Sequence, residues 1–351
     1  MSNLPKIDTQ NMVHFLKTLL ETPSPTGFTD LAMDYVEMTF NSIPDLGLRR
    51  TRKGGLLITW KGKSDEAPRA LTAHVDTLGA MVKEIKSSGR LKLSKLGGYP
   101  WNTVEGEGVT IFPSEGENVR GSILLVKSSV HVHGKKVGEM ERNDDNVEVR
   151  LDARTSTAEE TQKLGIRVGD FVAFDPRVEV TNGFIRSRHL DDKACVANIY
   201  SAVKSMIDAG LQPAQTTTIL ISNYEEVGHG ASVGFPEDIT ELVTVDMAAI
   251  GDGQTSDEFH ATLCVKDSGG PYSYQLNRKL RKLAEEHSIP HKVDIYPYYG
   301  SDGEAFWRAG GDVQVSLIGP GVDASHNYER THTDALEATT QWLMAYLMSE
   351  V

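Results

Sequence analysis

The chain has 351 residues, of which 36 are basic and 49 acidic, so its formal net charge is −13. Its length predicts about two domains at roughly 150 residues each, and the acidic surplus argues against nucleic acid or an anionic membrane as a partner. The only cysteines, Cys195 and Cys264, exclude a disulfide framework and a cysteine-rich zinc module. Because the sequence has neither a long apolar run nor a basic-then-apolar leader, we expect a cytoplasmic protein without a membrane partner.

The N-terminal part alternates helical and strand patterns. Apolar residues recur at helical spacing over residues 12–20, and a second helix is predicted at about residues 29–41. Two apolar, β-rich runs at residues 56–60 and 70–73 predict buried strands, and the second runs directly into His74. This part of the chain therefore begins an α/β domain.

The middle of the chain has a different texture. Between residues 81 and 185, short β-like pieces are separated by Gly, Pro and Asn-Asp turns. We therefore predict an α/β domain in two parts, residues 1–80 and 186–351, with a β-rich domain inserted at residues 81–185.

After residue 185 the alternation of helices and strands resumes. An apolar stripe predicts a helix over residues 196–207 that stops at Gly210. Strands are predicted at residues 216–222, 242–245 and 313–318, and helices at residues 274–287 and 304–309. In such α/β folds, sites gather beyond the carboxyl ends of the strands. Four potential ligands fall at these ends: His74, Glu225, Glu226 and Asp246.

Each of these residues has an ordinary structural explanation when it is taken singly. A histidine after a strand is usually a loop or core residue, and Asp191-Asp192 before a helix would serve as an N-cap. Together, however, imidazoles and carboxylates suit zinc, cobalt or manganese better than calcium. One bridging carboxylate can hold two ions, and a carboxylate that stays off the metals can take a proton from water. Adjacent glutamates at a strand end offer this division of roles.

Five motifs occur in order along the chain: Ala73-His-Val-Asp76, Leu190-Asp-Asp-Lys193, Glu225-Glu-Val-Gly228, Val245-Asp-Met247 and Thr331-His-Thr333. In these motifs the sequence resembles the M42 family of cocatalytic metallo-aminopeptidases, the glutamyl and tetrahedral aminopeptidase group, and more distantly the M20, M18 and M28 peptidases.

The resemblance implies two divalent metal ions per subunit, zinc or cobalt in the first place and manganese as a further option. Glu225 would be the general base, and Asp76 would orient the His74 imidazole. The ligands that it implies are His74, Asp191 as the bridge, Glu226, Asp246 and His332.

The last ligand has a competitor, because His326 lies six residues before His332. The family places its ligand just after an Arg-containing strand and before a small residue, which favours His332. Thr77, Lys193 and Cys195 depart from the family pattern, and we expect them to affect substrate preference rather than catalysis.

The implied fold is a mixed-sheet α/β/α catalytic domain with an inserted, PDZ-like β domain. The implied activity is hydrolysis of N-terminal residues from short peptides. The implied assembly is a homo-oligomer of the tetrahedral dodecamer type, in which the inserted domain at residues 81–185 mediates oligomerisation and residues 1–80 and 186–351 form the catalytic domain. The alternatives are a same-site metallohydrolase acting on a dipeptide or an acylated small amide, a glycosidase of the cellulase type, and a non-catalytic scaffold. A glycosidase gives no reason for histidines at the motif positions.

Overall fold

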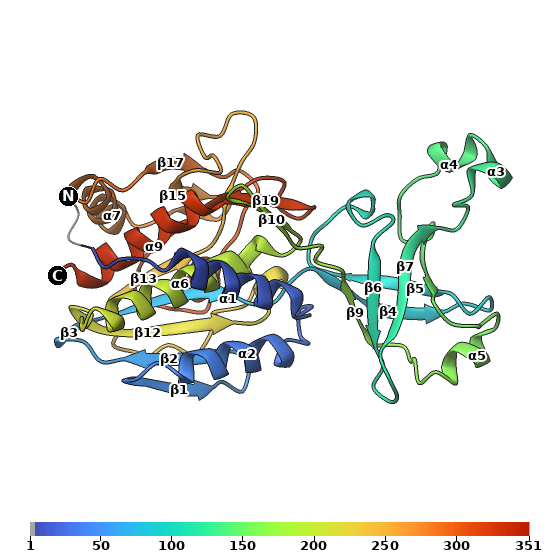
Figure 1. Ribbon diagram of the computed structural model, residues 1–351, viewed down its shortest axis with the longest axis horizontal. Helices are drawn as coiled ribbons and strands as arrows, with labels where there is room; N and C mark the ends of the chain where they lie inside the picture. Colours follow the sequence, from blue (N-terminus) through green and yellow to red (C-terminus); the bar gives the residue numbers. More distant parts are fainter. Residues whose placement is uncertain (1–3, 351) are drawn as a thin grey trace.

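A computed structural model describes residues 4–350 of the chain. The chain forms two bodies: an α/β body holding both termini, and a smaller β-barrel beside it (Figure 1). Within residues 4–350, no helix is long and apolar enough to cross a membrane.

The α/β body is built on a ten-stranded mixed sheet in the order β1-β2-β12-β3-β13-β18-β15-β16, with β14 paired to β18 and β17 to β15. Its strands are β1 (Leu46–Arg50), β2 (Leu56–Trp60), β3 (Ser64–His74), β12 (Gln215–Ser222), β13 (Glu241–Val245), β14 (Ala248–Ala249), β15 (Ala261–Asp267), β16 (Gly270–Pro271), β17 (His291–Ile295) and β18 (Gln314–Val322). The four central strands β12, β3, β13 and β18 are parallel, and Ser222 lies opposite His74. The carboxyl ends of these strands therefore meet at one edge.

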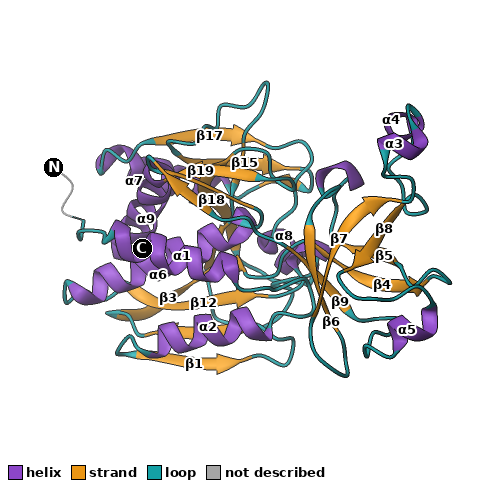
Figure 2. Ribbon diagram, turned by 45° about the vertical axis from the view of Figure 1, so that its right-hand side comes forward, coloured by secondary structure: helices purple, strands orange, loops and turns teal. Residues whose placement is uncertain are grey.

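Helices cover both faces of this sheet, as the sequence predicts. One face packs against α1 (Thr9–Glu21), α2 (Asp30–Asn41), α6 (Leu190–Asp208), α7 (Tyr274–Glu286) and α9 (Thr333–Met348). On the opposite face lies the short helix α8 (Asp302–Arg308), behind the sheet in Figure 2. The apolar stripe of residues 12–20 is buried in the main core, which confirms the first predicted helix.

The barrel closes from six antiparallel strands in the order β4-β5-β8-β7-β6-β9. These are β4 (Gly79–Ile85), β5 (Leu91–Leu96), β6 (Gly108–Phe112), β7 (Val119–Leu125), β8 (Val147–Leu151) and β9 (Phe171–Phe174), accompanied by η1 (Trp101–Thr103), α3 (Val130–His133), α4 (Lys136–Glu139) and α5 (Ala158–Gln162). The barrel has its own apolar core, separate from that of the sheet. Its strands match the β-rich texture between residues 81 and 185, whereas the exact domain boundaries stay a prediction.

A small three-stranded sheet joins the segment that follows the barrel to the C-terminal region. It consists of β10 (Glu179–Thr181), β11 (Phe184–Ser187) and β19 (Glu329–His332), with Phe184 opposite His332. Because β11 leads into α6 and β19 leads into α9, this sheet sets where the two helices begin.

Candidate metal centre and active-site pocket

The candidate site lies at the carboxyl edge of the parallel strands. His74 is the last residue of β3, and Asp246 directly follows β13. Glu225 and Glu226 form the 3-10 turn η2 (Glu225–Val227) just after β12. Asp191 comes from the start of α6 and is joined to Asp192 by a cis peptide bond. Elements distant in sequence thus bring the predicted residues to one place.

Three of these residues form the tightest group. His74, Asp191 and Asp246 are all buried, and each offers a ligand atom within 4.8 Å of the others. The Nε2 atom of His74 lies 3.2 Å from Asp191 Oδ1, while its Nδ1 atom lies 2.9 Å from the backbone oxygen of Asp76. A hydrogen bond from Nδ1–H to that oxygen leaves the Nε2 lone pair directed at the carboxylates, as a metal ligand requires.

The Asp76 carboxylate has a different set of contacts from the one expected. It lies 3.7 Å from His74 Nδ1, so the backbone carbonyl, not the carboxylate, is the nearer partner of the imidazole. The carboxylate accepts hydrogen bonds from the Thr26 hydroxyl at 2.8 Å and from the amides of Glu225 and Glu226 at 3.2 and 3.4 Å. Asp76 therefore fixes the η2 turn that carries both glutamates.

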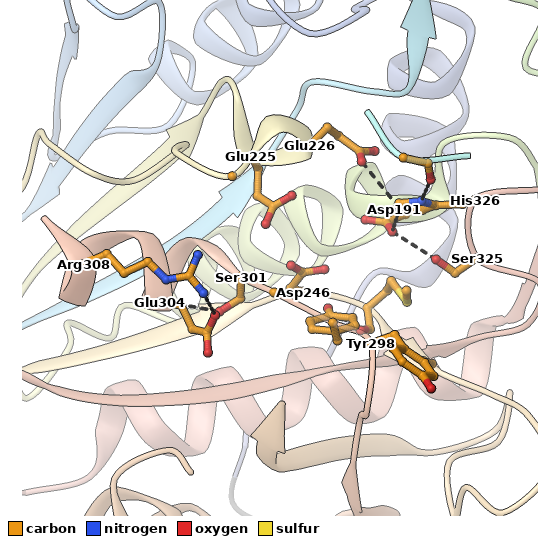
Figure 3. Close-up of a pocket in the computed structure, with 16 residues that line it drawn as sticks. Asp191, Glu225, Glu226, Asp246, Tyr298, Ser301, Glu304, Arg308, Ser325 and His326 are labelled. Atoms are coloured by element: carbon orange, nitrogen blue, oxygen red, sulfur yellow. Dashed lines mark hydrogen bonds and ion pairs between the residues drawn. The ribbon is translucent and has the colours of Figure 1, made fainter. Parts of the chain in front are cut away.

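A second group shares Asp191 with the first. The Nε2 atom of His326 lies 3.4 Å from Asp191 Oδ2 and 3.4 Å from Glu226 Oε2. The other ring nitrogen of His326 lies 2.6 Å from the backbone oxygen of Gly98, which orients the imidazole. Ser325 also donates a hydrogen bond to Asp191 Oδ2, at 3.2 Å (Figure 3). The two oxygens of Asp191 thus face two different histidines.

The structure does not bring His332 into this cluster, so its expected position is corrected. The Nε2 atom of His332 lies 3.3 Å from the backbone oxygen of Asn182, and its Nδ1 accepts a hydrogen bond from the Asp334 amide at the start of α9. Its ring packs between Phe184 and Phe259, with centroid distances of 4.8 and 5.2 Å. The strand pairing of β19 with β11 imposes this position, and His326 lies where the second histidine was expected.

Sequence reasoning also missed Glu329, which holds the Asp191 loop. The Glu329 carboxylate accepts hydrogen bonds from the amides of Asp191 and His326, both at 3.1 Å. Its position depends on the turn that includes Ser325-His-Asn327, which the structure closes with a bridge between Asp323 and Arg330.

Burial and mutual repulsion perturb the carboxyl groups. Burial raises the pKa of Glu226 to about 8 and that of Asp246 to about 7, and it raises the pKa of Glu225 well above its usual range. Burial would lower the pKa of His326, but the charges of Glu226 and Asp191 raise it to about 11. The site therefore holds more acidic groups than its two histidines can neutralise.

The residues present fit divalent metal ions. Glu226 Oε1 and Asp192 Oδ1 are buried, and neither has a hydrogen-bond partner within the part of the chain that the structure describes. A buried carboxylate oxygen without a donor is costly unless a cation satisfies it. The donor set of imidazole nitrogens and carboxylate oxygens is the kind that zinc, cobalt and manganese accept.

The cluster forms one end of a pocket of about 520 Å³ (Figure 3). Beyond the acidic cluster, the pocket is lined by Tyr298, Tyr299, Glu304 and Arg308. This volume is in the range of small-molecule sites, so a side chain of a substrate can enter beside the reacting groups.

The three residues that depart from the family pattern do not line this pocket. Lys193 and Cys195 are fully buried in α6, and the Lys193 ammonium donates to the backbone oxygens of Leu19 and Thr22. Thr77 is also buried. Their contacts are with the surrounding fold, and their expected effect on substrate preference stays a prediction.

Comparisons with known proteins agree with this geometry. The family model described as M42 glutamyl aminopeptidase matches residues 54–342. The Bacillus subtilis protein named "Putative aminopeptidase YhfE" is 48% identical over 338 residues, covering 96% of this chain and 97% of its own. The lysyl aminopeptidase of Pyrococcus furiosus is 24% identical and covers 80% of each chain.

Among solved structures, the TET1 peptidase of Pyrococcus horikoshii has a TM-score of 0.83 and 21% identity, covering 97% of this chain and 100% of its own. That peptidase can assemble into a tetrahedron or a large octahedral shell. This likeness shows the shared fold. Taken with the family match over most of the sequence, it places the chain in the M42 peptidase family, whose members are aminopeptidases.

Proposed function

We propose that this chain is an aminopeptidase that uses two divalent metal ions held on either side of Asp191. The carrying observation is that Asp191 Oδ1 faces His74 while Oδ2 faces His326. His74 and Asp246 would complete one ion's protein ligands, and Glu226 and His326 the other's. Bound there, the ions would supply Lewis-acid polarisation of a carbonyl and acidification of water.

Glu225 has the position and environment of a general base. Its carboxylate lies in the same pocket, with Oε2 3.8 Å from His74 Nε2. Burial raises its pKa well above the ordinary range, and the Asp76 carboxylate holds its backbone amide. Such a group takes a proton from the attacking water and returns it to the leaving amine of the cleaved peptide bond.

The pocket also favours a free amino terminus. Two of its lining carboxylates, Glu225 and Glu304, are not among the proposed metal ligands, so negative charge remains there to attract an ammonium group. We therefore infer that the substrates are short peptides with unblocked N-termini, and that the alternative of an acylated amide fits less well.

Assembly forms a further part of the proposal. We infer that the chain is a homo-oligomer of the tetrahedral type, in which the barrel, as a variant of a PDZ-like domain, supplies contacts between subunits. The named assembly of the Pyrococcus horikoshii peptidase supports this inference. Both cysteines are unbridged and buried, which suits a cytoplasmic, reducing location.

The proposed activity is tested with Glu225→Gln, a near-isosteric change that removes the basic carboxylate. We expect a loss of about 10²- to 10⁴-fold in kcat, with bound zinc or cobalt retained in elemental analysis. Glu66→Gln, at an exposed glutamate in β3, is the matched control and should behave as wild type.

An N-acetylated copy of the best peptide serves as the substrate control. Normal turnover by Glu225→Gln, or equal cleavage of the acetylated peptide, would refute the proposed mechanism. Hydrolysis of cellulose-type substrates that persists after chelation would instead favour the glycosidase alternative.

A further inference from the structure

A second carboxylate, Glu304, lies in the pocket away from the metal cluster. It belongs to the first turn of α8, and its side chain is only 7% exposed. The carboxylate rests on the turn between β15 and β16, where a β-carbon on Gly269 would come within 1.6 Å of Glu304 Oε1. The glycine therefore leaves the space that this carboxylate occupies, and the packing holds it in place.

The cation beside it is much less constrained. Arg308 donates to Glu304 Oε2 at 2.8 Å from one helical turn further along, but its side chain is 65% exposed. This is the one hydrogen bond that Arg308 makes within residues 4–350. Arg308 can thus leave readily, whereas Glu304 stays.

Behind Glu304 lies another carboxyl group. Asp267 is fully buried, accepts a hydrogen bond from the Gly269 amide at 2.9 Å, and is also bonded by the Tyr272 hydroxyl. Burial, and then the hydrogen bond with Asp267, raise the pKa of Glu304 to about 7. Glu304 is therefore backed by a second acidic group, and an anionic side chain entering the pocket would be repelled by the Glu304 carboxylate.

The pocket that Asp246 and Glu304 share also has an apolar lining. Met247, Ala249 and Tyr299 contribute to it, and Tyr298, with 97% of its surface exposed, lines it as well. A lysine or arginine side chain has the matching character, because its aliphatic stem packs on apolar surface while its charged end reaches a polar group.

We propose that Glu304 is a specificity residue that selects substrates with lysine or arginine at the N-terminus. The ammonium or guanidinium group of the substrate replaces Arg308 against the Glu304 carboxylate. In the absence of substrate, Arg308 occupies the position that the ammonium or guanidinium group of the substrate would take. This inference rests on the proposed aminopeptidase function and names its substrate class.

The test compares lysine p-nitroanilide with norleucine p-nitroanilide, which has a methyl group in place of the ammonium group. The wild-type enzyme, loaded with zinc or cobalt, should favour lysine by about 10- to 100-fold in kcat/KM, the range of a hydrogen bond to a charged group. Glutamate p-nitroanilide should be cleaved less well than norleucine p-nitroanilide.

Two variants separate the roles of the pair. Glu304→Gln should bring the lysine-to-norleucine ratio close to one, whereas Arg308→Gln should keep the preference for lysine. Equal or better cleavage of norleucine by the wild type would overturn the inference without reference to any variant. A preference for glutamate that disappears in Arg308→Gln would overturn it as well.

Failure of the underlying function gives a different result. If no aminoacyl anilide is hydrolysed by the metal-loaded enzyme, the proposed aminopeptidase function fails. If norleucine and lysine substrates are both cleaved without preference, the function stands and only the role of Glu304 is refuted.

Discussion

Replacing each of the two competing histidines by alanine separates metal binding from folding. His326 Nε2 lies 3.4 Å from both Asp191 Oδ2 and Glu226 Oε2, whereas His332 is bonded to the Asn182 carbonyl. The prediction is that His326→Ala weakens binding of one metal ion, and that His332→Ala leaves both ions in place.

The magnitudes follow from these contacts. Loss of a residue that only orients a metal ligand costs about 10- to 100-fold in affinity, so loss of the ligand His326 should cost at least about 100-fold. His332 accepts the Asp334 amide at the start of α9 and packs between two phenylalanines. Losing the cap costs about 1 kcal/mol, and losing the aromatic contacts costs a similar amount.

The assay titrates chelator-treated protein with Zn²⁺ in a calorimeter and measures unfolding in urea on the same samples. His326→Ala should lose one binding event, with at most a small change in the stability of the metal-free protein. His332→Ala should keep two binding events and unfold at lower urea. The reverse pattern, in which His332→Ala loses an ion and His326→Ala does not, would refute the assignment made from the geometry.

Three further outcomes are expected. Asp302→Ala removes the acceptor of the Ala231 amide and of the buried Thr72 and Ser222 hydroxyls. The free energy of unfolding measured in urea should therefore fall by about 1–3 kcal/mol for each unsatisfied group, and kcat should be lower. The lysine-to-norleucine ratio should rise from pH 6 to pH 8, because the pKa of Glu304 is about 7 and only its ionised form attracts a cation; a flat ratio would contradict this. Chelated protein should lose thermal stability as pH rises from about 4 toward 8. The pKa values of Glu226 and Asp246, about 8 and 7 when folded, lie above their unfolded values of about 4, so folding binds protons in that range; an unchanged melting temperature would contradict this.

Most of the central sheet could be predicted because its signals are local. The run of apolar residues that ends at His74 and the one that ends at Asp246 are the parallel strands β3 and β13. Parallel strands place their carboxyl ends together, so the grouping of these residues follows from strand direction alone. The same argument applies to Glu225 and Glu226 after β12.

The barrel and the second histidine depend on long-range pairing, which leaves little local signal. The barrel closes because β4 pairs with β9, so that Met81 lies opposite Phe171. His332 is directed away from the pocket by its register with Phe184 across two strands. A one-residue change of register would reverse the face on which a strand's side chains lie, and the motif by itself does not specify that register.

The contrast between the two acidic regions of the pocket indicates how one cavity can serve both chemistry and selection. Around Asp191, buried carboxylates outnumber the histidines, and Glu226 Oε1 has no donor among the described residues, so bound divalent ions would satisfy this region. The region around Glu304 needs no divalent ion. Glu304 and Asp267 share one excess negative charge, and Arg308 balances that charge. A monovalent cation on a flexible stem can replace Arg308, but it cannot satisfy the cluster around Asp191. A substrate with a basic N-terminal residue therefore has one favoured orientation, with its side chain at Glu304 and its peptide bond at Glu225.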